Sequence, residues 1–222
     1  MSSSRLPGKV MAPILGRPMI SRQIERLRRS ALIDDLVVAT STDPTDDPLA
    51  AHCEAEGVAV FRGALDDVLG RFCSALEARP AARTVIRLTA DCPLADWNVI
   101  DQVIAHHRDE DADYCANTPA VRTFPHGLDT EVVRASVLLE AGREARDPYE
   151  REHVTPFVYR RPQRYRTAWV NRQPSLAQLR WTVDVPSDLA FVREVYDQLY
   201  PADPAFGTEA IAALPVNSAE VP

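Results

Sequence analysis

The sequence predicts an α/β domain, because short β-branched runs alternate along the chain with segments whose apolar residues recur at helical spacing. Its 222 residues are enough to bury one substantial core. No internal repeat, flexible linker or break in composition divides them. We therefore expect residues 1–222 to form a single domain, with residues 201–222, rich in Ala and Pro, as a peripheral tail that holds at most one short helix.

Each predicted element has its own signal in the sequence. The helices combine an apolar face with a capping residue, as where Asp96 precedes Val99, Ile100, Val103 and Ile104. The predicted helices cover residues 49–56, 66–76, 96–104, 135–144 and 187–199. The predicted strands cover residues 36–40, 58–61, 84–89, 127–133, 166–171 and 179–183.

Composition restricts the class of partner. The formal charge of −7 and the isoelectric point near 5.3 disfavour binding to nucleic acid or to an anionic membrane. Both of these partners are negatively charged and bind positively charged protein surfaces. We expect small-molecule partners, no nucleic acid and no membrane insertion, because no apolar run approaches spanning length. The four cysteines are scattered without metal-ligand spacing, and no signal peptide is recognisable, so a cytoplasmic location is expected.

The chain contains a single lysine, Lys9, and every other fixed cation is an arginine. One interpretation is chance, in a genome whose composition favours arginine codons. The other is a compact ammonium that the planar guanidinium cannot replace beside a phosphate. The neighbouring residues favour the second interpretation. Residues 2–9 form a hydroxyl-rich loop with two cations, Arg5 and Lys9, and with Gly8 for close backbone approach.

This N-terminal loop suits a polyphosphate, although its position at the chain end would equally fit a disordered terminus. It is not a P-loop, because the GxxxxGK[ST] pattern is absent. Two further loops share one pattern, in which a strand runs into an aspartate and then a proline: Asp91 before Pro93, and Asp184 before Pro186. Ligands collect at strand ends in open α/β sheets. Mg²⁺ prefers one or two carboxylates with phosphate oxygens, so the pair predicts a magnesium site, although each aspartate alone fits a capping or turn role.

Six motifs in order resemble one enzyme family, the spore-coat-polysaccharide type of cytidylyltransferase. The chain is more distantly similar to the cytidylyltransferases that activate 3-deoxy-manno-octulosonate and sialic acids. The resemblance extends from the first residues to about Pro201. The motifs are RLPGK at residues 5–9, DDVLGR at 66–71, DCPL at 91–94, GLDTEV at 127–132, DPYEREHVTP at 147–156 and LRWTVD at 179–184.

The resemblance implies a three-layer α/β/α nucleotide-diphospho-sugar transferase fold, Rossmann-like, with a mixed, mostly parallel sheet. It implies a Mg²⁺-dependent nucleotidyltransferase that joins a nucleoside triphosphate, with CTP expected, to a sugar or sugar phosphate for surface polysaccharide or glycan synthesis and releases pyrophosphate. A homodimer is the default for such enzymes. The implied catalytic residues are Arg5, Lys9, Asp91 and Asp184, with Asp91 and Asp184 as metal ligands; Ser4, Gly8, Arg71 and Arg87 would bind the nucleotide; Asp129, Glu131, Glu152 and His153 would shape the sugar pocket.

One departure from the family pattern concerns the first strand. The family places an apolar strand immediately before the phosphate loop, whereas this sequence begins inside that loop. We expect the missing strand upstream of Met1. Without it, neighbouring strands would expose unpaired edges.

Two other functions are compatible with the sequence. A glycosyltransferase of related fold could use Asp111 and Asp113 as a DxD-like metal site, although their position after a helix end favours a plain turn. A catalytically silent nucleotide-binding protein is the second. For the arginine-rich residues 160–166 a solvated face is favoured over an anion site. His153 is as compatible with helix packing as with proton transfer.

Overall fold

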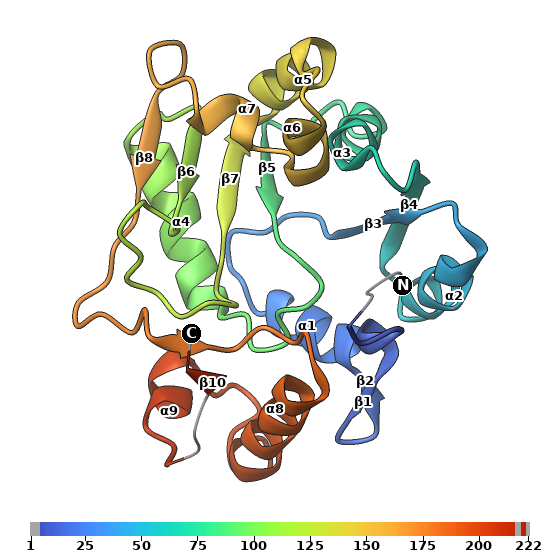
Figure 1. Ribbon diagram of the computed structural model, residues 1–222, viewed down its shortest axis with the longest axis vertical. Helices are drawn as coiled ribbons and strands as arrows, with labels where there is room; N and C mark the ends of the chain where they lie inside the picture. The colour runs from blue at the N-terminus through green and yellow to red at the C-terminus, as the bar shows by residue number, and fades with distance from the viewer. Residues whose placement is uncertain (1–4, 216–218, 221–222) are drawn as a thin grey trace.

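The computed structural model describes residues 5–215 and 219–220 (Figure 1). Its helices are α1 (Met19–Leu27), α2 (Asp47–Ala55), α3 (Val68–Glu77), α4 (Trp97–Asp109), α5 (Ala135–Glu144), α6 (Pro148–His153), α7 (Pro156–Tyr159), α8 (Pro186–Leu199) and α9 (Thr208–Ala212), with 3₁₀ turns at Lys9–Met11 and Pro44–Asp46. Its strands are β1 (Pro13–Ile14), β2 (Arg17–Pro18), β3 (Val37–Ser41), β4 (Ala59–Gly63), β5 (Thr84–Arg87), β6 (Tyr114–Ala116), β7 (Glu131–Arg134), β8 (Thr167–Trp169), β9 (Leu179–Arg180) and β10 (Ala219–Glu220). Within this part of the chain, no helix has both the length and the apolar character needed to cross a bilayer.

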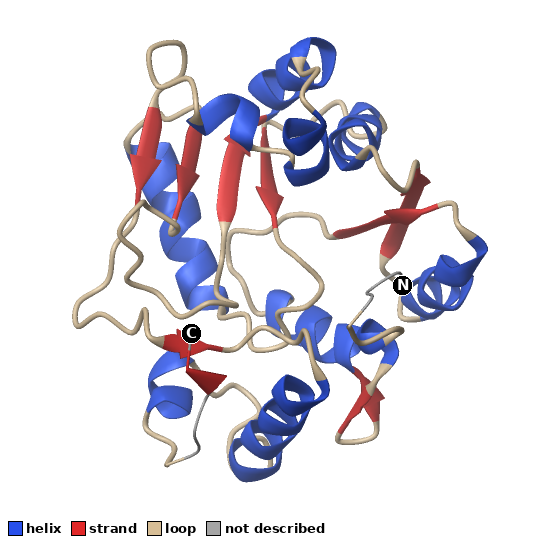
Figure 2. Ribbon diagram, in the orientation of Figure 1, coloured by secondary structure: helices blue, strands red, loops and turns tan. Residues whose placement is uncertain are grey.

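The strands form a mixed arrangement. The largest sheet has the order β5-β7-β6-β8, in which β7 runs antiparallel to both neighbours and β6 runs parallel to β8. A parallel pair, β3 and β4, stands apart from it beside α2 (Figure 2). The register of β5 and β7 places Arg87 opposite Glu131. The mixed sheet that the resemblance implies is therefore present, with parallel pairs at β3–β4 and β6–β8 and with antiparallel pairs on both sides of β7.

Both faces of the four-stranded sheet are buried. Cys115 and Val132 belong to the apolar cluster that contains α4, whereas their chain neighbours Tyr114 and Val133 belong to the cluster that contains α3 and α5. Successive residues of a strand point to opposite faces, so each face of the sheet packs against its own helices. This alternation confirms the three-layer architecture.

Most predicted elements are present, with ends that differ by a few residues. The helix predicted at residues 135–144 is α5 with the same bounds, and the strand predicted at 36–40 is β3. The sequence reading assigned no helix to α1, whose buried face includes two arginines. Arg26 is 2% exposed and donates from Nε to the Ala95 carbonyl at 2.7 Å and from Nη2 to the Phe206 carbonyl at 2.9 Å. Such tertiary contacts leave no signal in local periodicity.

The C-terminal segment is less peripheral than predicted. It contains one short helix, α9, as expected, but Phe206 and Ile211 are 2% and 4% exposed and belong to the main apolar core. The description of residues 201–222 as a peripheral tail is therefore corrected for these two side chains.

Among the described residues, β3 pairs only with β4 and β5 only with β7. The upstream strand stays a prediction.

A tight contact around Gly127 joins the loop before β7 to the segment that begins with β9. His126 donates from its backbone nitrogen to the Leu179 carbonyl at 3.0 Å, and Trp181 donates to the His126 carbonyl at 2.7 Å. Gly127 has φ of 103°, and a Cβ atom there would lie 2.8 Å from the Trp181 carbonyl carbon. Only glycine satisfies both the backbone conformation and the close approach.

We expect Gly127→Ala to lower the free energy of unfolding by about 2–3 kcal/mol, from left-handed strain and overpacking together. Gly57→Ala is the matched control, because Gly57 has φ of +70° with no atom within 4 Å of an added Cβ. It should lose only about 1 kcal/mol, the cost of the backbone conformation. Urea denaturation measures both values. Equal losses in the two variants would contradict the packing argument.

Candidate functional site

The ammonium of Lys9 lies at the centre of a cluster of charged side chains. Gly8, in the left-handed conformation with φ of 70°, turns the chain into the 3₁₀ turn Lys9–Met11, and Val10 in that turn packs into the core. Lys9 Nζ donates to Asp91 Oδ2 at 3.3 Å, to Asp184 Oδ1 at 3.0 Å and to the Val183 carbonyl at 2.6 Å. Its side chain is only 12% exposed. One cation therefore contacts both predicted carboxylates.

The two aspartates meet because their loops are hydrogen-bonded to each other. Asp91 follows β5, and Asp184 follows β9. Val183 donates from its backbone nitrogen to the Asp91 carbonyl at 2.9 Å, which fixes the two loops side by side. Among the described residues, no group of three or more His, Cys, Asp or Glu side chains could hold a metal ion. Asp91 and Asp184 are two carboxylates that contact one ammonium, and Mg²⁺ in proteins is commonly held by one or two carboxylates together with phosphate oxygens.

Three cations surround Asp184. Arg5, which is 62% exposed, contacts Asp184 Oδ1 at 3.1 Å, the oxygen that Lys9 also contacts. Arg180 Nη2 donates to the other oxygen, Oδ2, at 2.8 Å. Burial alone would raise the pKa of Asp184, but the hydrogen bond and charge of Lys9, together with Arg180 and Arg5, hold that pKa below its ordinary value. The carboxylate is therefore ionised over the whole neutral range.

Arg180 and Asp188 hold Asp184 in place, and the sequence analysis did not identify either of them. Asp188, with 3% of its side chain exposed, accepts from Arg180 Nη1 at 2.8 Å and from the backbone nitrogens of Asp184 at 2.7 Å and Val185 at 3.0 Å. It thus caps α8 and fixes both the backbone and, through Arg180, the side chain of Asp184. The spacing of Asp184 and Asp188 at the start of a predicted helix was the available signal.

A cavity of about 580 Å³ contains most of the predicted sugar-site residues. Arg87, Asp129, Glu131 and His153 line it, together with Tyr114, Thr118, Ala120, Arg122, Tyr149, Thr155, Pro156, Tyr159 and Trp169. Glu152 is exposed, and it is not among the residues that line the cavity. The structure therefore brings three of the four predicted sugar-site residues together.

The charges inside the cavity are paired. Glu131, 8% exposed, accepts from Arg87 and from the hydroxyls of Tyr114 and Thr155. Arg122 donates to both oxygens of Asp129, at 2.5 and 2.9 Å. Glu131 is therefore an anchor of the cavity wall, and Arg87, predicted at the nucleotide, contacts this anchor.

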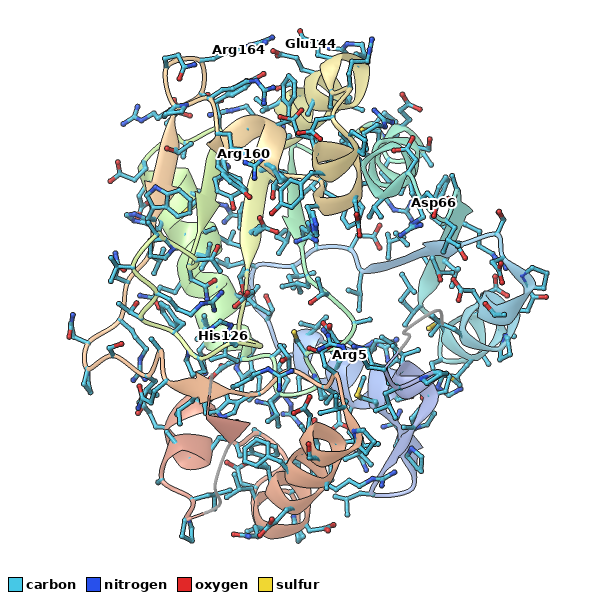
Figure 3. All side chains as sticks on the ribbon, in the orientation of Figure 1. Arg5, Asp66, His126, Glu144, Arg160 and Arg164 are labelled. Carbon is cyan, nitrogen blue, oxygen red and sulfur yellow. The ribbon has the colours of Figure 1, made fainter. Side chains whose placement is uncertain are left out.

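Backbone contacts join the segment that leads to Asp129 of the cavity to the segment that leads to Asp184. The charges of Asp91 and Asp129 both act on the Cys92 thiol, whose pKa is raised by burial and then by these two carboxylates. His126, three residues before Asp129, pairs through its backbone with the strand that carries Arg180. In Figure 3, Arg5 and His126 lie where the loops below the four-stranded sheet run, whereas Arg160 and Arg164 lie among the helices above it.

The remaining predicted residues occupy other places. Arg71, on α3, is half-buried and donates to the Ala64 carbonyl at 2.6 Å. Ser4 lies outside the described residues. Trp181 is 1% exposed and lies within the core.

Three arginines between residues 160 and 166 form ion pairs, and the pairs of Arg164 and Arg166 lie at the surface. The ion pairs are Arg161 with Glu150, Arg164 with Glu140 and Glu144, and Arg166 with Glu110. For residues 160–166 the sequence favours a solvated face over an anion site, and the surface ion pairs of Arg164 and Arg166 agree with that expectation.

The lowered pKa of Asp184 gives a pH dependence. A depressed carboxyl pKa stabilises the fold above the ordinary value of 3.8, and this contribution is lost as pH falls further. We expect Asp184→Asn to be less stable than the natural protein at pH 7, with a difference that shrinks below pH of about 4. Thermal unfolding of both proteins at pH 7 and at pH 3 measures this difference in stability. A difference of the same size at pH 7 and pH 3 would contradict the electrostatic origin.

Comparison with known proteins shows which family this chain resembles. Residues 1–200 match the sequence model of a family described as cytidylyltransferase. The spore coat polysaccharide biosynthesis protein SpsF of Bacillus subtilis is 34% identical over 225 residues, with 98% of this chain and 91% of that protein covered. A 3-deoxy-manno-octulosonate cytidylyltransferase of Geobacter sulfurreducens is 33% identical over 122 residues, covering 54% of this chain and 44% of that protein.

A solved structure extends the comparison to three dimensions. The structure of a cytidylyltransferase from Leptospira borgpetersenii superposes with a TM-score of 0.88 at 28% identity, over 96% of this chain and 88% of that one. The sequence match over residues 1–200 and the shared fold have one explanation: the chain is a nucleotidyltransferase and belongs to the cytidylyltransferase family.

Proposed function

We propose that this protein transfers the cytidylyl group of CTP to a sugar or sugar phosphate, with Mg²⁺, and releases pyrophosphate. The observation that carries the proposal is the simultaneous contact of Lys9 Nζ with Asp91 and Asp184. A compact cation and two carboxylates within one contact shell are the groups that a metal-bound triphosphate needs. The names of the relatives point to the synthesis of a polysaccharide or a nucleotide sugar.

The reaction requires positioning and charge neutralisation more than covalent help. An oxygen of the acceptor, either a sugar hydroxyl or a sugar-phosphate oxygen, attacks the α-phosphate in line, and the bond to the bridging oxygen of the leaving pyrophosphate breaks. A hydroxyl nucleophile gives up its proton to solvent, and no covalent enzyme intermediate forms. Asp91 and Asp184 would hold Mg²⁺, which when bound neutralises charge on the phosphate oxygens. Lys9 and Arg5 bind the β- and γ-phosphates and stabilise the negative charge that develops on the leaving group.

The sugar is assigned to the cavity of about 580 Å³. Tyr149, Tyr159 and Trp169 provide aromatic faces against which the apolar side of a sugar ring can pack. Asp129 and His153 provide polar groups for sugar hydroxyls, and Arg122 orients Asp129. Because Arg87 contacts Glu131 in this cavity, we assign it to the sugar side of the site and not to the nucleotide.

A specific observation disfavours the glycosyltransferase alternative. Arg134 contacts Asp111 Oδ1 at 2.9 Å and Asp113 Oδ1 at 3.1 Å, and the second oxygen of Asp113 accepts from the Arg166 backbone nitrogen at 3.0 Å. These carboxylates are committed to holding the turn after α4. A DxD-type metal site would have to break those contacts.

We expect Asp91→Asn and Asp184→Asn each to lower turnover by about 100-fold or more, because each removes charge needed as the pyrophosphate departs. Pyrophosphate release measures turnover. Asp35→Asn is the control, since Asp35 is a 59% exposed partner of Arg79 at the surface. Near-normal turnover in either site variant would refute the assigned roles.

A screen of the four nucleoside triphosphates against phosphorylated, amino and acidic sugars tests the reaction itself. We expect pyrophosphate release with CTP and one class of sugar, and only with Mg²⁺ present. Release of a nucleoside diphosphate from a nucleotide sugar would support the glycosyltransferase instead. Triphosphate binding without pyrophosphate release under any sugar would support the silent binding protein.

A further inference from the structure

All three donor positions of the Lys9 ammonium have acceptors. They are Asp91 Oδ2, Asp184 Oδ1 and the Val183 carbonyl. Two of these acceptors are the carboxylates that the proposed function assigns to Mg²⁺, and the third lies in the chain beside Asp184. An ammonium in this position cannot contact a phosphate without giving up at least one of these hydrogen bonds. Lys9 is thus committed to the metal-binding oxygens.

The cations around Asp184 differ in how firmly they are held. Arg180 donates to the buried Asp188 from Nη1 at 2.8 Å and from Nη2 at 3.1 Å. These two hydrogen bonds fix the guanidinium that contacts Asp184 Oδ2. Lys9 and Arg5, which both belong to the N-terminal segment, share Asp184 Oδ1. Lys9 and Arg5 therefore contact one oxygen of Asp184, and Arg180, which Asp188 holds in place, contacts the other.

We propose that Lys9 and a divalent cation compete for the same oxygens of Asp91 and Asp184, so that metal and triphosphate bind cooperatively. A divalent ion alone must displace the ammonium from both carboxylates, which leaves the Val183 carbonyl as the one remaining of these three acceptors. A triphosphate supplies new acceptors, because its oxygens accept the hydrogen bonds that Lys9 and Arg5 release. The carboxylates then become available to the metal. This inference rests on the proposed function and adds the coupling between its two ligands.

The coupling is reciprocal by thermodynamic necessity. If the triphosphate strengthens metal binding by a given factor, the metal strengthens triphosphate binding by the same factor. Lys9 has opposite effects on the two ligands taken separately. It weakens binding of the metal alone and strengthens binding of the triphosphate. A lysine that served only the phosphates would affect metal binding by general charge repulsion, to the same extent as any nearby cation.

The test is a titration of the protein with Mn²⁺ alone, followed by electron paramagnetic resonance. We expect Lys9→Met to bind Mn²⁺ at least tenfold more tightly than the natural protein. Lys9→Gln, which keeps a hydrogen-bond donor but no charge, should behave similarly and covers the case in which Lys9→Met folds poorly. Arg5→Met should give a smaller gain, because Arg5 contacts only Asp184. Arg79→Met, a charge-matched change at a surface pair, should give none.

Equal Mn²⁺ affinity in the natural protein and in both Lys9 variants would overturn the inference. Asp184→Asn separates this failure from failure of the proposed metal site. If Asp184→Asn alone loses Mn²⁺ binding, the metal site stands and the competition is absent. If Asp184→Asn binds Mn²⁺ as the natural protein does, both are wrong. With the inert analogue α,β-methylene-CTP, Mn²⁺ should strengthen analogue binding more in the natural protein than in Lys9→Met.

Discussion

The contact of one ammonium group with two carboxylates is the interaction on which the rest of the site depends. Lys9 Nζ joins Asp91 and Asp184, which are 93 positions apart in the sequence, at a place that is mostly shielded from solvent. Without that cation the two negative charges would repel each other at close range. With it, the N-terminal loop and the loops after β5 and β9 are held around one point. In the proposed function, a triphosphate and a metal together replace what the ammonium supplies.

The fold provides the rigid frame for this contact. Residues of β6 and β7 point alternately to two apolar clusters, so the four-stranded sheet is fixed from both faces. The loop that carries Asp91 leaves the edge of this sheet, and the backbone hydrogen bond from Val183 ties it to the loop that carries Asp184. Gly127 brings β9 against the loop that leads to Asp129. The cavity and the aspartate cluster therefore share their supporting segments.

The sequence was most informative where the chemistry is local. A single lysine after Gly8 and two aspartates after strands indicated the cluster, and the structure brings all three together. Contacts between distant segments were not predictable in the same way. Arg26 satisfies carbonyls near residues 95 and 206, and Asp188 acts through Arg180, so neither leaves a periodic pattern. Glu131 lines the same cavity as Asp129 and His153, and its bonds to Arg87, Tyr114 and Thr155 show an anchoring role that only the assembled sheet reveals.

The most direct test of the account is a crystal structure with Mn²⁺ and α,β-methylene-CTP, with the metal located by its anomalous scattering. The account predicts one peak within coordination distance of carboxylate oxygens from both Asp91 and Asp184, and Lys9 Nζ turned from those oxygens to the phosphates. A peak that contacts only one of the two aspartates, or Lys9 still bound between them beside the metal, would contradict it.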